Sequence, residues 1–212
     1  MSTRPEGTEK SSLRAAYTFA AGAAAAAAGT AQAEVVYSGV QDLSVAQFSS
    51  LGLDIDLDGF ADLTLKNYVF GGGNYQGATV IYAPGQLVGF NAGPSGYAYV
   101  TALSEGFVID ASSVGPTFFG SMAYGGSNPN AQFNMVDNAY LGLSFARGGG
   151  LNYAWVRVSI DNAAGTFVVH DWAFDDAGAG IAAGVIPAPP VLGMLAAGAA
   201  GLGLMRGRQR KA

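Results

Sequence analysis

The chain has 212 residues, no cysteine and a formal net charge of −5 at pH 7, and its charges are unevenly distributed. Seven of the ten basic side chains lie within residues 1–14 or 206–212, whereas residues 34–186 hold 13 acidic side chains against 3 basic ones, a net charge of −10. An acidic middle segment repels phosphate, which argues against a nucleic-acid partner, and without disulfides the fold must depend on packing, on a bound metal, or on both.

The first segment has the composition of a secretory signal peptide. Residues 1–14 are polar with a net positive charge, residues 15–30 are uncharged and rich in alanine, and Ala31 and Ala33 supply the small side chains that signal peptidase accepts. We therefore expect a signal peptide over residues 1–33, cleaved before Glu34, with signal peptidase and the general secretion machinery as partners. The alternative is an alanine-rich helix that the mature protein retains.

Residues 34–184 predict an all-β extracytoplasmic domain. Apolar and polar residues alternate in short runs bounded by glycine, asparagine and proline, and no run keeps a helical period for long. We expect a two-sheet β-sandwich or a jelly-roll-like domain. The predicted strands cover residues 34–37, 51–57, 63–70, 79–83, 87–90, 98–102, 107–109, 140–145, 152–160 and 166–174. A short helix is predicted over residues 44–50, and the glycine-rich residues 71–77 and 123–130 are predicted to be loops.

A run of alternating aspartates is the strongest candidate for a metal site. The candidate ligands are Asp54, Asp56, Asp58 and Asp62. Carboxylates at alternate positions, followed by a glycine that permits a sharp turn, suit a hard cation such as Ca²⁺. The glutamate that completes an EF-hand loop is absent, because Leu65 stands in its place. The same run also fits a β-hairpin in which Leu53, Ile55 and Leu57 face the core and the aspartates face water. Both alternatives stay open.

Two alternating runs near the end of the body predict a β-hairpin. They cover residues 152–161 and 166–174 and flank a short turn at residues 162–165 that is rich in asparagine and glycine. We expect the rings of Trp155 and Trp172 to pack near the surfaces of the sheet that this hairpin joins.

The last segment has the three parts of a membrane anchor. Residues 185–190 form a proline-rich spacer, residues 191–205 carry no charge, and a basic end covers residues 206–211. Its cationic side chains are Arg206, Arg208, Arg210 and Lys211. We expect a transmembrane helix over residues 191–205 whose basic end stays in the cytoplasm. Fifteen helical residues span about 22 Å, which is short for a permanent anchor in a hydrocarbon core of about 30 Å.

This tail, residues 185–212, resembles the PEP-CTERM sorting signal, in which a Pro-Glu-Pro motif precedes a short transmembrane helix and an arginine-rich end. Here the motif is Pro187, Ala188 and Pro189, so the central carboxylate is missing. The hairpin residues 153–156 and 171–174 and the ending 181–184 are also similar to the closing hairpin of many PEP-CTERM ectodomains. The resemblance implies processing by an exosortase-like enzyme, and the alternative is a tail anchor that is never cut.

An enzyme is not expected from the sequence. The chain lacks cysteine, a Gly-x-Ser-x-Gly motif and a phosphate-binding loop, and its single histidine, His170, would need a nucleophile and a carboxylate beside it in space. Its neighbour Asp171 would point to the opposite face of a regular strand.

Three functions from different classes remain. The first is a non-enzymatic protein of the cell surface or exopolysaccharide matrix of a Gram-negative-type bacterium, at least transiently anchored in the membrane. The second is a carbohydrate-binding module, whose candidate aromatic residues are Tyr75, Tyr97, Tyr99 and Tyr124. The third is a secreted hydrolase.

Overall fold

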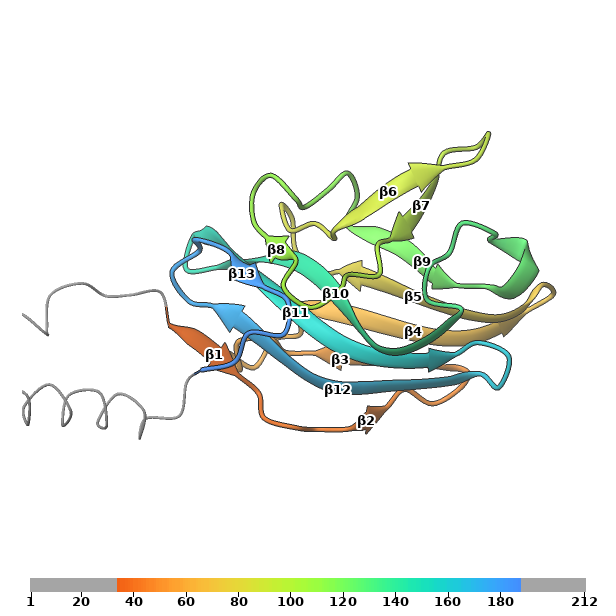
Figure 1. Ribbon diagram of the computed structural model, residues 1–212, viewed down its shortest axis with the longest axis horizontal. Coiled ribbons are helices and arrows are strands. Elements are labelled where there is room, and N and C mark those ends of the chain that lie inside the picture. The colour runs from red at the N-terminus through yellow and green to blue at the C-terminus, as the bar shows by residue number, and fades with distance from the viewer. Residues whose placement is uncertain (1–33, 188–212) are drawn as a thin grey trace, which may run out of the picture. The chain divides into compact units, whose positions relative to one another are not determined.

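The computed structural model describes residues 34–187, and this part of the chain is all-β, as predicted (Figure 1). Its only helical element among the described residues is a 3-10 turn at Gly125–Ser127. The strands are β1 (Val35–Tyr37), β2 (Leu43–Ser44), β3 (Ser49–Leu53), β4 (Leu63–Phe70), β5 (Gly73–Val80), β6 (Gly89–Ala92), β7 (Tyr97–Val100), β8 (Val108–Ile109), β9 (Phe119–Ala123), β10 (Met135–Arg147), β11 (Gly150–Asp161), β12 (Thr166–Asp175) and β13 (Ile181–Ala182). Within residues 34–187 no helix is long and apolar enough to cross a membrane.

One sheet is antiparallel and has the strand order β1-β12-β11-β10, with β2 also paired to β12. Its centre is the hairpin β11–β12, in which Asp161 pairs with Thr166 across the turn. The predicted hairpin is therefore confirmed. Strand β10 extends the sheet and pairs with β11 from Met135 to Arg147.

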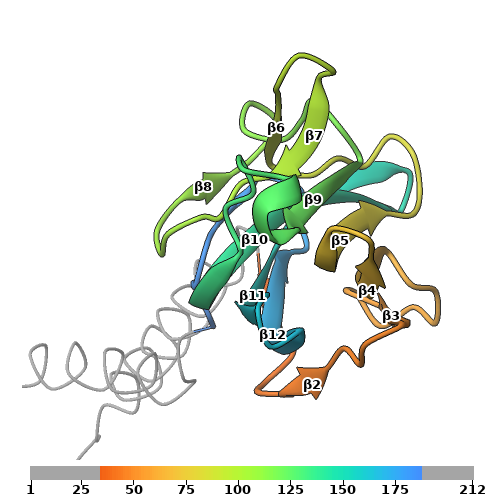
Figure 2. The same cartoon turned by 90° about the vertical axis from the view of Figure 1, so that its right-hand side faces the viewer.

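The other large sheet has the order β3-β4-β5-β9-β7-β6. Strands β4 and β5 form a long antiparallel pair from Leu63 opposite Val80 to Phe70 opposite Gly73. The two views in Figures 1 and 2 show β3, β4 and β5 lying alongside β10, β11 and β12. Side chains from both sheets fill the space between them.

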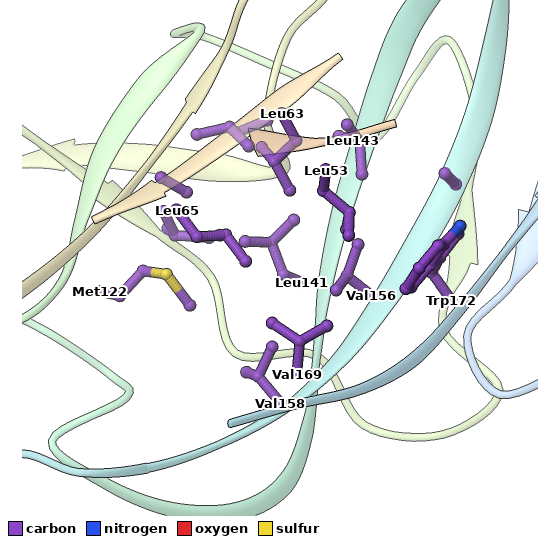
Figure 3. Close-up of a cluster of buried hydrophobic side chains, with 14 of the residues drawn as sticks. Leu53, Leu63, Leu65, Met122, Leu141, Leu143, Val156, Val158, Val169 and Trp172 are labelled. Atoms are coloured by element: carbon purple, nitrogen blue, oxygen red, sulfur yellow. The ribbon is translucent and has the colours of Figure 1, made fainter. Parts of the chain in front are cut away.

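The main core lies between these two sheets (Figure 3). Leu63, Leu65 and Met122 come from the second sheet, and they share one buried cluster with residues of the first sheet such as Leu141 and Val156. Each buried side chain of this size stabilises the fold by about 1.5–3 kcal/mol. Burial of the inward-facing positions therefore explains why the alternating runs of the sequence form paired strands.

A second buried cluster covers the outer face of the first sheet. Tyr153, Trp155 and Ala173 project from β11 and β12 on the side opposite the main core. They are covered by side chains of β8, β13 and the neighbouring loops, namely Val88, Leu103, Ile109, Ile181 and Ala183. Strand β11 is therefore buried on both faces over much of its length.

Two β-bulges interrupt the regular alternation of the first sheet. The pairing of β11 with β12 shifts between Arg157 and Val158, which leaves His170 as the extra residue of β12. The pairing of β10 with β11 shifts between Val136 and Ala139, with the extra residue in β10. A bulge turns side chains away from the face that strict alternation predicts.

Several local predictions need correction. No helix forms at residues 44–50, because the chain there is extended and the amide of Val45 donates to the carbonyl of Phe167 in β12. The strand predicted at residues 51–57 ends at Leu53. The glycine-rich residues 71–77 are mostly strand, since β5 begins at Gly73, and β9 was not predicted.

Candidate functional site

The acidic run forms a loop that joins β3 to β4. Asp54, Asp56 and Asp58 each bring a carboxylate oxygen to within 4.8 Å of the other two. The carboxylates also fold the loop, because Asp54 accepts bonds from the amides of Asp58 (3.2 Å) and Gly59 (2.9 Å). Leu57 has a positive φ of 61° and is 74 % exposed, so the plain hairpin with Leu57 in the core is wrong.

Asp62, the fourth predicted ligand, lies apart from the other three carboxylates. It is buried, and its Oδ2 accepts a bond of 2.9 Å from the amide of Ile55. Burial raises the pKa of Asp62 to about 6, although the bond from Ile55 opposes this shift and the negative charges of Asp56, Asp58 and Asp54 add to it. Asp62 therefore holds the backbone of the loop through the amide of Ile55 and is not grouped with the other three carboxylates.

A cationic side chain already reaches the cluster. Arg147 Nε lies 3.0 Å from Asp56 Oδ2, and the guanidinium lies 5.1 Å from the ring centre of Phe174. Ca²⁺ takes about six to eight oxygen ligands. The three carboxylates supply suitable oxygens for part of such a shell, but a cation here competes with Arg147 for Asp56.

We expect calcium to raise the melting temperature of the protein, and only at millimolar concentration because of this competition. Binding to the folded state alone stabilises it by mass action. The measurement is thermal unfolding in calcium against chelator. Asp54→Asn should abolish the calcium response because it removes a ligand charge. Asparagine keeps an oxygen that can accept the amide of Gly59, so the loop should stay folded. An unchanged melt of the unmodified protein across this range would contradict a calcium site.

We expect Asp62→Asn to stabilise the protein above pH 7 by about 1–3 kcal/mol, because asparagine can accept the Ile55 bond without a buried charge. In the unmodified protein the folded pKa is raised to about 6 from an ordinary value near 3.8. Between these values the folded state holds a proton that the unfolded chain has lost, so stability falls as pH rises. Urea unfolding at pH 3 and pH 8 measures the effect, which should vanish at the lower pH because that pH lies below both pKa values. An equal gain in the free energy of unfolding at both pH values would rule out the buried charge as its cause.

The outer face of the first sheet brings together residues that the sequence did not connect. His170 lies between Ser159 and Asp42, with Nε2 2.8 Å from Ser159 Oγ and Nδ1 2.7 Å from Asp42 Oδ1. The His170 side chain is 20 % exposed and that of Asp42 is 62 % exposed. The histidine therefore has both a hydroxyl and a carboxylate neighbour, from residues far from it in the sequence.

The bulge at His170 explains this placement. Val169 and Trp172 both lie in the main core, so His170 and Asp171 between them both face outward. Asp171 bonds to Arg157 on the same face that carries Ser159, and the expectation that His170 and Asp171 point to opposite faces is wrong. The carbonyl of His170 accepts the amide of Asp42 at 3.2 Å, which fixes the carboxylate beside the ring.

The bulge of β10 supplies the remaining neighbours of Ser159. Asp137 Oδ1 accepts the Ser159 hydroxyl at 2.8 Å, and the backbone amide of Asn138 donates to Ser159 Oγ at 3.1 Å. An open depression of about 380 Å³ adjoins these groups. It is lined by Met135, Val136, Asp137, Ser159, Ile160, Asp161, Thr166 and Val168.

The four candidate sugar-binding tyrosines are divided between two places. Tyr75 and Tyr124 meet edge to face, with ring centres 5.5 Å apart, and both contact the ring of Phe70. Burial raises the pKa of the Tyr75 hydroxyl. Tyr99 is buried and stacks on Phe90, and Tyr97 is exposed on the β6–β7 hairpin. The tyrosines do not form one platform.

Hydrogen bonds hold both ends of the described chain. The amide of Glu34 donates to Asp176 Oδ1 at 2.8 Å, and Trp155 Nε1 donates to the carbonyl of Val185 at 3.2 Å. Pro187 is exposed. The other predicted processing and anchoring residues lie outside the described residues, namely Ala31, Ala33, Ala188, Pro189, the helix 191–205, Arg206, Arg208, Arg210 and Lys211.

Comparison of the chain with protein-family models, with curated proteins and with solved structures found no match.

Proposed function

We propose that this chain is an exported protein of the bacterial cell surface or exopolysaccharide matrix, carried there by an N-terminal signal peptide and a PEP-CTERM-like C-terminal tail. Its body is a β-sandwich-type domain outside the cytoplasm. The proposal concerns location and anchoring, and it does not depend on whether the body also catalyses a reaction.

The observation that carries the proposal is the position of the body between the two predicted signals. Among the described residues, Glu34, which follows the predicted cleavage site, is hydrogen-bonded to the body, and so is the carbonyl of Val185, two residues before the proline motif. Cleavage before Glu34 would turn its amide nitrogen into an ammonium group, which suits the carboxylate of Asp176 2.8 Å away. The body therefore keeps its first strand after processing.

Mass spectrometry of the full-length protein expressed in a host with and without an exosortase tests both signals. We expect the mature chain to begin at Glu34 in both hosts, and the tail to be lost only where the exosortase is present. Retention of residues before Ala33 in the exported protein would contradict the signal peptide. A tail that stays intact and membrane-bound in both hosts would contradict sorting and leave a simple anchor.

The aromatic cluster favours polysaccharide binding as a second candidate function. Phe70, 52 % exposed, lies beside Tyr68, Tyr75 and Tyr124 at one end of β4 and β5. Flat rings at a surface suit the apolar faces of sugars. Affinity electrophoresis in neutral polysaccharide should show retardation that Phe70→Ala removes and that Phe119→Ala, an exposed aromatic on β9 outside this cluster, leaves intact. If no polysaccharide changes the electrophoretic mobility of the protein, polysaccharide binding is contradicted.

A further inference from the structure

We propose that Ser159, His170 and Asp42 form a nucleophile, base and orienting carboxylate that hydrolyse small neutral esters at the depression beside β10, β11 and β12. The proposal rests on geometry alone and is independent of where the protein is sorted. The three side chains come from β11, from the bulge of β12 and from the segment before β2.

An acceptor beside Nδ1 favours the tautomer of His170 that a base requires. In that tautomer Nδ1–H donates to Asp42 at 2.7 Å, and the lone pair of Nε2 faces Ser159 Oγ 2.8 Å away. A base oriented by a carboxylate and bonded to a hydroxyl is the geometry by which serine becomes a nucleophile. Asp137 is a second acceptor for the same hydroxyl proton, at 2.8 Å, so it competes with His170.

The reaction balances with these groups and water. Ser159 Oγ attacks the ester carbonyl carbon while its proton passes to His170 Nε2. The carbon–oxygen bond to the alcohol then breaks, and the alcohol leaves with the proton from His170. Water attacks the acyl-serine, gives one proton to His170 and releases the acid, and that proton returns to Ser159 Oγ.

The surroundings of Ser159 select the substrate class. The amide of Asn138, which donates to Ser159 Oγ at 3.1 Å, is the candidate donor for the oxyanion that forms on the attacked carbon. Arg157 Nη1 holds the Asn138 side chain at 3.1 Å and adds positive charge nearby. The depression also carries the carboxyl groups of Asp137 and Asp161, which repel anionic substrates, and apolar side chains that suit a short acyl group.

Two of the four non-glycine residues with positive φ among the described residues lie at this place. Asp42 and Asn138 have positive φ values of 49° and 57°, and each contacts a member of the His170–Ser159 pair. Both β-bulges of the sheet lie beside the same pair. Bulges and left-handed non-glycine residues cost stability and concentrate at functional sites. The two bulges and the left-handed Asp42 around one serine–histidine pair are therefore a reason to assign Ser159 a reaction.

The full-length protein treated with a fluorophosphonate probe at pH 8 tests the assignment, because the probe loses fluoride as serine oxygen bonds to its phosphorus. We expect peptide mapping to place the label on Ser159. His170→Ala should slow labelling at least ~100-fold, as loss of a general base does. Asp42→Asn, which tolerates the same backbone conformation, should slow it ~10-fold, because Asp42 is exposed and its charge is screened. Asp137→Asn should speed labelling, since a competing acceptor is weakened.

If Asp42 only stabilised the fold, its replacement would leave the pH dependence of Ser159 labelling unchanged. We expect the pH of half-maximal labelling to change in Asp42→Asn and to stay unchanged in Glu105→Gln, a matched loss of an exposed carboxylate. Peptide mapping uses the unmodified protein, so this part of the test does not depend on whether any variant folds. Absence of label on Ser159 in the folded protein, or equal labelling and p-nitrophenyl acetate hydrolysis in Ser159→Ala, would overturn the proposal.

Discussion

Replacement of Trp155 by alanine is expected to lower the free energy of unfolding by about 3–5 kcal/mol. Trp155 is 1 % exposed in the outer cluster, where its ring contacts Tyr140 edge to face and Tyr37 at a tilt. Truncation would leave a cavity beneath β8 and β13, and it would release the Val185 carbonyl. Urea unfolding followed by circular dichroism measures the loss.

Trp155→Phe separates the two contributions of the indole. Phenylalanine keeps most of the ring packing but has no donor for the Val185 carbonyl. We expect a loss of about 1–2 kcal/mol from the missing bond and the smaller ring. A loss in Trp155→Ala below about 1 kcal/mol would show that the outer cluster contributes little to stability, and that residues 181–185 are held by their backbone bonds alone.

The part of the fold that the sequence predicted is the part governed by local alternation. The predicted strand at residues 63–70 coincides with β4, and the runs around Trp155 and Trp172 pair as expected because their apolar side chains are buried in the two clusters. Glycine-rich residues 73–77 were misassigned. In the structure Gly77 pairs with Lys66, and a Cβ at Gly77 would clash with the Tyr75 ring, so glycine there serves packing within a strand.

The candidate sites also differ in how far local sequence determines them. Three aspartates of the acidic run meet because they are close in sequence, whereas Asp62 turns inward toward the amide of Ile55. The neighbours of His170 depend on bulges and on a contact with Asp42 across 128 residues, and no periodicity encodes either. One signal was available: Asp137 and Asn138 are poor strand formers within a long alternating run, which indicates a bulge.

Replacement of Asp171 by alanine is expected to cost about 2–4 kcal/mol, because it strips partners from a partly buried cation. Arg157 donates from Nε at 2.9 Å and from Nη2 at 2.6 Å to the Asp171 carboxylate, whose side chain is 3 % exposed. The same carboxylate accepts the Tyr37 hydroxyl at 2.8 Å. Burial first, and then the bond to Asp171, raise the pKa of Tyr37, and the Asp171 bond raises the pKa of Arg157.

A double-mutant cycle separates this ion pair from the rest of the sheet. Arg157→Met alone should cost at least as much as Asp171→Ala, since it leaves the less exposed partner, the carboxylate, charged and without its cation. The double variant should recover part of either loss, which gives a coupling free energy of about 1–3 kcal/mol. Additive losses would show that the pair does not act as a unit. Because Arg157 also holds Asn138 beside Ser159, Arg157→Met should slow labelling of Ser159 as well, whereas a purely structural ion pair would change stability and leave that rate unaltered.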